Sequence, residues 1–287
     1  MPLSKEEQDQ IKQEMDTAMH GDRQQQSPLF PLNEHSHIKH VIGVMSGKGG
    51  VGKSLVTGIL ATQLSRHNAK VGIMDADITG PSIPKMFGLD DMLAGAKDNN
   101  LVPVTTKGGI KVMSTNLILQ HNDDPVLWRG PILAGALRQF WGQCDWGDID
   151  FLLVDMPPGT GDVALTVFQS LPIEGVIIVS SPQDLVQMVV GKAVRMAKMM
   201  KIAVLGLVEN MAYIECPHCG EKIEPFGPSR AKETANHYDM DFLGQLPINP
   251  DFSEMCDEGT IEEKLPRNLL PDGIAAILTS AELMGER

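Results

Sequence analysis

Cysteine is scarce in this sequence, with four residues among 287. A secreted domain held together by disulfides would need a denser set, so the cysteine count excludes that class. Cys144 and Cys256 stand alone, whereas Cys216 and Cys219 form a C-x-x-C pair. In a reducing compartment such a pair binds metal or carries out redox chemistry more often than it forms a structural bridge. The cysteines therefore indicate one candidate sulfur site rather than a framework.

Long apolar runs and an excess of positive charge are also missing. The longest apolar stretches, such as 151–154 and 175–179, have the length of strands and are too short to span a bilayer. The first twenty residues lack the apolar segment of a signal peptide, and they carry Glu and Asp, which mitochondrial transit peptides avoid. The net charge is −13, which disfavours non-specific binding to nucleic acid or anionic lipid. We therefore expect a cytoplasmic protein with no nucleic-acid and no membrane partner.

Polar residues dominate the first 39 positions, and strand-like apolar runs begin only after them. We expect residues 1–39 to be a flexible tail, because they lack the apolar side chains for a core of their own. Residues 40–287 are expected to form a single domain. Within it we predict strands at 41–46, 71–75, 110–114, 151–155, 175–180, 203–208 and 242–244.

Most of these runs are continuously apolar, which indicates strands covered on both faces. Helix-like segments follow most of the strands, and this alternation is typical of βαβ units with right-handed connections. The sequence therefore predicts an α/β fold with a doubly wound, mostly parallel sheet flanked by helices.

Residues 47–54 read GKGGVGKS, which fits the G-x-x-x-x-G-K-[ST] pattern of a phosphate-binding loop. The loop lies between a β-run and an apolar helical stretch, the context that a P-loop NTPase fold requires. Its glycines let backbone N–H groups turn toward phosphate oxygens, and the helix N-terminus adds positive potential. Lys53 is expected to reach the β- and γ-phosphates, and Ser54 to ligate Mg²⁺. We predict that ATP is held by Gly47, Lys48, Gly49, Gly50, Val51, Gly52, Lys53 and Ser54.

Carboxylates end two of the predicted strands. Asp155 closes the apolar run 151–155 in the manner of a Walker B acid, and we expect it to hold the Mg²⁺ shell through water. Asp75 closes the run 71–75, and Asp77 follows it by two positions. The two side chains would share a face if the strand continued. Ligands of such folds bind at the C-terminal ends of the strands, which favours a chemical role for these acids over turn capping.

Several longer motifs occur in unbroken order over about residues 38–285. GKGGVGKS, with its additional lysine Lys48, is joined by DADITGPSIP (75–84), DMPPGTGD (155–162), WRGPI (128–132), ENM (209–211), CPHCG (216–220) and GQLPINP (244–250). Together they closely resemble the Mrp/ApbC family of iron–sulfur cluster carriers, which are MinD-like ATPases with a deviant Walker A loop.

The resemblance implies a homodimer that sandwiches two ATP molecules. In that arrangement Lys48 reaches across to the partner's nucleotide, and Asp77 positions the attacking water. Asp155 is the Walker B acid, Asn210 recognises adenine, and Pro247 belongs to a loop that closes over the base. Lys48, Lys53 and Asp77 are then the catalytic candidates of an ATP hydrolase.

The C-x-x-C pair supplies two thiolates, whereas a zinc ion or an iron–sulfur cluster usually takes four ligands. A symmetric homodimer would bring two pairs, Cys216 and Cys219 from each chain, to one axis. The resemblance implies that the segment near 210–226 holds a bridging [4Fe–4S] cluster in this way. A zinc ion shared across the dimer has the same ligand set and stays open as an alternative. A thioredoxin-like dithiol is disfavoured, because no thioredoxin-type βαβ unit precedes the pair.

These features favour an ATP-dependent carrier that passes a [4Fe–4S] cluster to apo iron–sulfur proteins. The alternative is a positioning ATPase of the MinD/ParA kind, which needs a basic amphipathic helix or surface. Residues 272–287 contain three acids and one base, which counts against that alternative. An electron donor like the nitrogenase iron protein is a third reading, but such proteins take their cluster ligands from separated positions.

Overall fold

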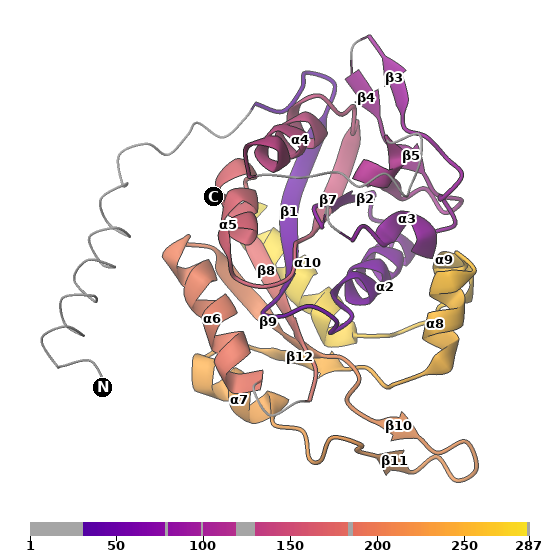
Figure 1. The fold of residues 1–287 in the computed structure, drawn as a ribbon, viewed down its shortest axis with the longest axis vertical. Coiled ribbons are helices and arrows are strands. Elements are labelled where there is room, and N and C mark those ends of the chain that lie inside the picture. The colour runs from indigo at the N-terminus through magenta and orange to yellow at the C-terminus, as the bar shows by residue number, and fades with distance from the viewer. Residues whose placement is uncertain (1–30, 78–79, 99, 119–129, 183–185, 286–287) are drawn as a thin grey trace, which may run out of the picture.

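The computed structural model describes residues 31–77, 80–98, 100–118, 130–182 and 186–285. Its centre is an eight-stranded sheet with the order β12-β9-β8-β1-β7-β2-β6-β5 (Figure 1). Neighbouring strands run parallel except at the edge pair β5–β6. The strands are β1 (His37–Ser46), β2 (Val71–Asp75), β5 (Val104–Thr105), β6 (Lys111–Met113), β7 (Asp148–Asp155), β8 (Gly175–Ser180), β9 (Ala203–Glu209) and β12 (Phe242–Gln245).

This sheet confirms the doubly wound, mostly parallel α/β fold. All seven predicted strands are present, and β2 and β8 begin and end at the predicted residues. The helices that surround the sheet are α2 (Lys53–Arg66), α3 (Ile83–Met86), α4 (Gly130–Gly142), α5 (Asp162–Ser170), α6 (Val186–Met199), α7 (Ala231–Tyr238), α8 (Pro250–Asp257), α9 (Ile261–Lys264) and α10 (Pro271–Gly285).

The helices form one layer on each face of the sheet, and each layer has its own apolar core. On β1, Ile42 and Val44 pack with α2, α3, α8, α9 and α10. Val41 and Met45 on the same strand pack with α4, α5, α6 and α7 on the other face. Alternate side chains of a strand point to opposite faces, so a continuously apolar strand serves both layers.

The domain begins earlier than the boundary expected at residue 40. β1 starts at His37, and the preceding Ser36 is buried. The side chains of Ser36 and Asn33 both donate hydrogen bonds to the carbonyl oxygen of Cys144, at 3.1 and 2.7 Å. Asn33, Ser36 and the start of β1 are therefore joined to the domain, whereas residues 1–30 of the expected tail lie outside the described residues.

Two small hairpins were not anticipated, because their strands are only two or three residues long and carry no apolar pattern. One pairs β3 (Gly95–Lys97) with β4 (Asn100–Val102), and the other pairs β10 (Ile214–Glu215) with β11 (Lys222–Ile223). The β10–β11 hairpin projects away from the sheet beyond β12 (Figure 1). Among the described residues, no helix has the length and apolar character needed to cross a membrane.

Candidate functional site

The phosphate loop joins the end of β1 at Ser46 to the start of α2 at Lys53. Gly50 and Gly52 adopt φ angles of 76° and 78°, a left-handed region in which residues other than glycine are strained. Gly47 is required by packing as well, because a Cβ there would lie 2.2 Å from a methyl carbon of Val189 on α6. Glycine at positions 47, 50 and 52 is therefore needed for the conformation of this loop.

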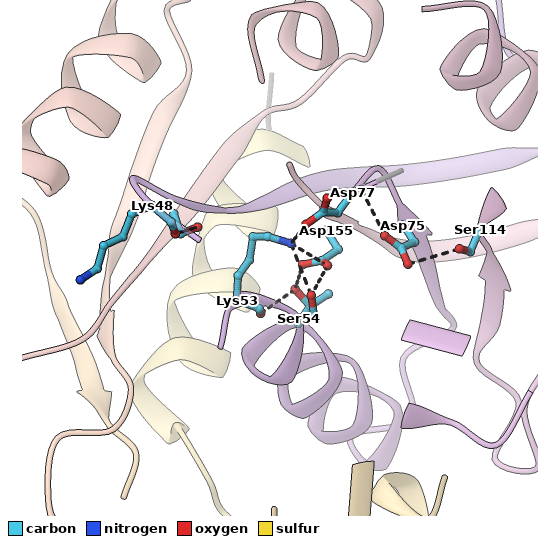
Figure 2. A network of polar contacts seen from close by, with 9 residues as sticks. Lys48, Lys53, Ser54, Asp75, Asp77, Ser114 and Asp155 are labelled. Atoms are coloured by element: carbon cyan, nitrogen blue, oxygen red, sulfur yellow. Dashed lines mark hydrogen bonds and ion pairs between the residues drawn. The ribbon is translucent and has the colours of Figure 1, made fainter. Parts of the chain in front are cut away.

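Four predicted site residues meet at the end of this loop (Figure 2). The Lys53 ammonium lies 2.7 Å from a carboxylate oxygen of Asp155 and 3.7 Å from one of Asp77. Ser54 donates a hydrogen bond of 2.6 Å to Asp155. Lys53 and Asp155 are buried, at 6% and 0% side-chain exposure, so their attraction is little screened by water. A hydroxyl beside carboxylates is the hard-oxygen donor set that suits Mg²⁺.

A pocket of about 300 Å³ opens in front of this cluster. That volume is at the lower end of ligand pockets, roughly 300–1,000 Å³. Neither Asn210 nor Pro247 is among the residues that line it. The lining residues are Ser46, Gly49, Gly50, Gly52, Lys53, Ser54, Leu55, Asp77, Ser82, Met86 and Pro158.

Thr57 is a site residue that the sequence analysis missed. Its hydroxyl is buried and donates a hydrogen bond of 2.7 Å to the second carboxylate oxygen of Asp155. Thr57 follows Lys53 by four positions on α2, so both project from the same face of the helix. Ser54 and Thr57 together fix the orientation of the Asp155 carboxylate.

We expect Thr57→Val to reduce kcat/KM for ATP about tenfold, because the hydrogen bond to the buried carboxylate is lost and a charged-group hydrogen bond contributes roughly 1.5–3 kcal/mol. Steady-state phosphate release measures the effect. Thr62→Val is the matched control, since Thr62 lies on the same helix, is equally buried, and its hydroxyl has no hydrogen-bond partner. Equal losses in the two variants would contradict a specific role for Thr57.

Asp75 and Asp77 have different surroundings, and they do not share a strand face. β2 ends at Asp75, and Asp77 lies in the loop that follows. Asp75 is fully buried and accepts hydrogen bonds from the Asp77 backbone N–H (3.1 Å) and the Ser114 hydroxyl (3.3 Å). Its carboxylate lies toward Ser114 (Figure 2), and Asp75 is not among the residues that line the pocket. Burial raises the pKa of Asp75 well above its usual range, and the negative charge of Asp155 adds to this shift. Asp75 thus supports the loop that places Asp77 in the pocket.

Three other predicted nucleotide residues, Lys48, Asn210 and Pro247, lie outside the Lys53 cluster. The Lys48 side chain points away from that cluster (Figure 2), on the side of the loop that packs against Val189 and Ser181. Asn210 is buried, and its amide donates a hydrogen bond of 3.0 Å to the carbonyl oxygen of Val51. Pro247 follows β12 outside the phosphate pocket. A role for Asn210 and Pro247 in base recognition stays a prediction.

The C-x-x-C pair occupies the turn between β10 and β11. Cys216 donates its N–H to the carbonyl oxygen of Glu221, and Gly220 donates to that of Cys216, both at 2.9 Å. Gly220 adopts a φ of 73°, which lets the chain reverse directly after the second cysteine. Backbone N–H groups of His218 and Cys219 donate to the Cys216 sulfur and lower the pKa of that thiol. The turn therefore presents the half-buried thiol of Cys216 next to the exposed thiol of Cys219.

One chain does not complete a metal centre at this turn within the part that the structure describes. There, no group of three or more His, Cys, Asp and Glu side chains is arranged to hold a metal ion. Cys144 is buried, which raises the pKa of its thiol strongly, and Cys256 packs half-buried against the apolar core. Thiolates suit zinc and iron–sulfur clusters, so Cys216 and Cys219 fit half of such a ligand set.

A family model for ParA proteins, described as the NUBPL iron-transfer P-loop NTPase, matches residues 37–277. The chain belongs to this family. An iron–sulfur cluster carrier protein of Clostridium perfringens is 51% identical over 243 residues, which cover 82% of this chain and 85% of that protein. The iron–sulfur cluster transfer protein NUBPL of Dictyostelium discoideum is 42% identical over 243 residues, covering 84% and 75%.

Solved structures agree with membership of the NUBPL family. A nucleotide-binding protein of Archaeoglobus fulgidus in complex with ADP is 48% identical and superposes with a TM-score of 0.73, covering 80% of this chain and 90% of that one. The cell division ATPase MinD of Pyrococcus furiosus superposes with a TM-score of 0.57 at 21% identity, covering 86% and 99%. The likeness to MinD concerns the fold alone. This member of the NUBPL family is therefore a P-loop NTPase.

Proposed function

We propose that this protein is an ATP-dependent carrier that binds a [4Fe–4S] cluster between two copies of the chain and transfers it to apo iron–sulfur proteins in the cytoplasm. The observation that carries the proposal is the combination of two sites in one domain. The phosphate pocket presents Lys53, Ser54 and Asp155, and a separate hairpin presents the cysteine pair Cys216 and Cys219 on its turn. A positioning ATPase would need the first site but has no use for the second.

ATP is the proposed substrate of the phosphate pocket. Lys53 reaches into the pocket and would bind the β- and γ-phosphates, while the loop N–H groups bind the remaining oxygens. Ser54 and, through water, Asp155 would hold Mg²⁺, which neutralises charge on the phosphates. Asp77 lines the same pocket and would orient the attacking water. Lys48 would act on the nucleotide of the second copy, a role that suits its direction away from its own site.

We expect Asp77→Asn to lower kcat for ATP about a hundredfold while changing the affinity for Mg-ATP little. A group that positions water acts mainly in the transition state, so kcat falls more than KM rises. Phosphate release and nucleotide titration together separate the two effects. Asp272→Asn, at an exposed acid on α10, is the control. Loss of nucleotide binding with no separate effect on kcat would instead assign Asp77 to the Mg²⁺ shell.

The cluster would be completed by symmetry, with Cys216 and Cys219 from each copy supplying four thiolates. The exposed turn supports this arrangement, because a cargo that must be handed on has to be reachable by the acceptor. The backbone N–H donors around Cys216 support it as well, since hydrogen bonds to sulfur stabilise the thiolate state that binds iron.

Anaerobic purification and reconstitution, followed by iron, sulfide and zinc analysis, tests the proposal. We expect about four iron and four sulfide per dimer, with transfer of the cluster to an apo [4Fe–4S] enzyme that gains activity. Tight zinc, no iron uptake and unfolding on chelation would replace the carrier function with a structural zinc site.

A further inference from the structure

The end of β9 lies between the two functional sites. Its last residue, Glu209, and the next residue, Asn210, are each 1% exposed, although both are polar. Asn210 donates its backbone N–H to the carbonyl oxygen of Ser180 (2.8 Å) and its side-chain amide to that of Val51 (3.0 Å). Asn210 is therefore fixed to β8 on one side and to the phosphate loop on the other.

Glu209 makes the opposite connection, toward the cysteine hairpin. Its Oε2 atom accepts hydrogen bonds from the Ser229 hydroxyl (2.6 Å) and from the Gln245 side chain (2.7 Å). Ser229 Oγ also accepts the N–H of Ala231 (3.2 Å), where α7 begins. The excursion that carries Cys216 and Cys219 leaves β9 after Glu209 and returns at Ser229, so one buried carboxylate holds both of its ends.

Two further contacts hold the departing strand in place. Ala212 donates its N–H to the carbonyl oxygen of Leu246 (2.9 Å), and Ile248 donates to that of Tyr213 (2.7 Å). Tyr213 directly precedes β10. Hydrogen bonds to the segment that follows β12 therefore fix the residues that connect the end of β9 to the hairpin.

The phosphate loop packs against Asn210 with no spare room. A Cβ built on Gly52 would lie 2.1 Å from the Asn210 amide nitrogen. Close-packed contacts of this kind respond to a shift by moving to another arrangement rather than by deforming smoothly. Any shift of the backbone at Gly52 toward Asn210 would therefore require the Asn210 side chain to move as well.

We propose that Glu209 and Asn210 are positioning residues that couple the phosphate loop to the cysteine hairpin, so that nucleotide binding changes how Cys216 and Cys219 are presented. The inference deepens the proposed function and rests on it only in taking the hairpin as the cluster site. Coupling between two binding sites is reciprocal. If nucleotide changes the affinity of the hairpin for a metal centre, the metal centre would change the affinity for nucleotide by the same factor.

The test uses the full chain without cluster, in a Cys256→Ser background so that the hairpin thiols dominate labelling. The alkylation rate of Cys216 and Cys219 by iodoacetamide is measured with and without Mg²⁺ and a non-hydrolysable ATP analogue. We expect the nucleotide to change this rate about fivefold or more, the lower range of typical allosteric coupling. In Ser229→Ala and in Glu209→Gln the nucleotide should change it less than about twofold.

The Ser229 hydroxyl bonds with Glu209 and Ala231 and does not line the phosphate pocket, so Ser229→Ala should bind the analogue as tightly as the parent protein. Ser170→Ala, at a buried serine of α5, is the matched control and should keep the full nucleotide effect. Thermal melting identifies any variant that fails to fold. An alkylation rate that ignores nucleotide in the parent protein, or a full effect in both folded variants, would overturn the coupling. Failure to take up iron would overturn the carrier function but leave this result intact, because no cluster is used.

Discussion

Lys53→Ala should abolish measurable ATP hydrolysis, with kcat reduced by at least about 10²–10³-fold, the loss typical of removing one electrostatic group from a reacting centre. The Lys53 ammonium is held at the pocket by Asp155 and Asp77, so it is already oriented toward the position of the phosphates. Preorganised charge in a buried site stabilises a transition state more than a mobile surface lysine can.

The fold of Lys53→Ala should persist, because Asp155 keeps its hydrogen bonds from Ser54 and Thr57. Phosphate release measures activity, and circular dichroism with thermal melting measures folding. Lys53→Arg is a useful companion, since it keeps the charge but not the compact ammonium, and we expect it to stay inactive. Lys70→Ala, at an exposed lysine, is the control. Wild-type turnover in folded Lys53→Ala would defeat the assignment of the phosphate loop.

Cys216→Ser and Cys219→Ser should each remove the bound cluster, because either change deletes two of four ligands from a symmetric dimer site. A serine hydroxyl is a poor replacement for a cysteine sulfur, because iron–sulfur clusters are held by thiolates and a hydroxyl stays protonated. Iron and sulfide per dimer after anaerobic reconstitution measure the loss. Nucleotide binding by the cluster-free variants should match that of the cluster-free parent protein, because the phosphate pocket contains no cysteine.

Cys144→Ser and Cys256→Ser are the controls within the same chain. Cys144 is fully buried beside Trp146 and Phe140 in one core, and Cys256 packs half-buried on the other face. Neither lies on the hairpin, so both variants should keep the cluster. Full cluster content in the Cys216 and Cys219 variants would rule out the hairpin as the carrier site.

Continuous apolar runs made the central strands predictable. β2 and β8 were placed to the residue, because each is an unbroken apolar segment between polar turns. The β10–β11 hairpin was not predicted, although its cysteines were singled out. Its strands have two exposed residues each, and their pairing depends on the turn at 216–220 rather than on burial. A pattern of burial in the sequence cannot indicate a strand that buries nothing.

The sequence also predicted that Lys53, Ser54 and Asp155 belong to one site, and the structure brings these three side chains together. Their roles in binding Mg-ATP stay predictions. Thr57 was missed because nothing near it in the chain shows that it faces Asp155, which is 98 positions away. Asp75 would have shared a face with Asp77 if the strand had continued, but β2 ends at Asp75, two residues before Asp77.

By itself the sequence determined the type of fold, the phosphate loop and the existence of a paired-thiol turn, because apolar periodicity, glycine conformation and ligand type are properties of short segments. Only the tertiary structure decided how these parts are joined. Glu209 contacts Ser229 and Gln245, and Asn210 contacts Val51 at 159 positions' distance, because β9 ends beside the phosphate loop in the folded sheet. Contacts between distant segments follow from strand order, and strand order is settled by packing the whole domain at once.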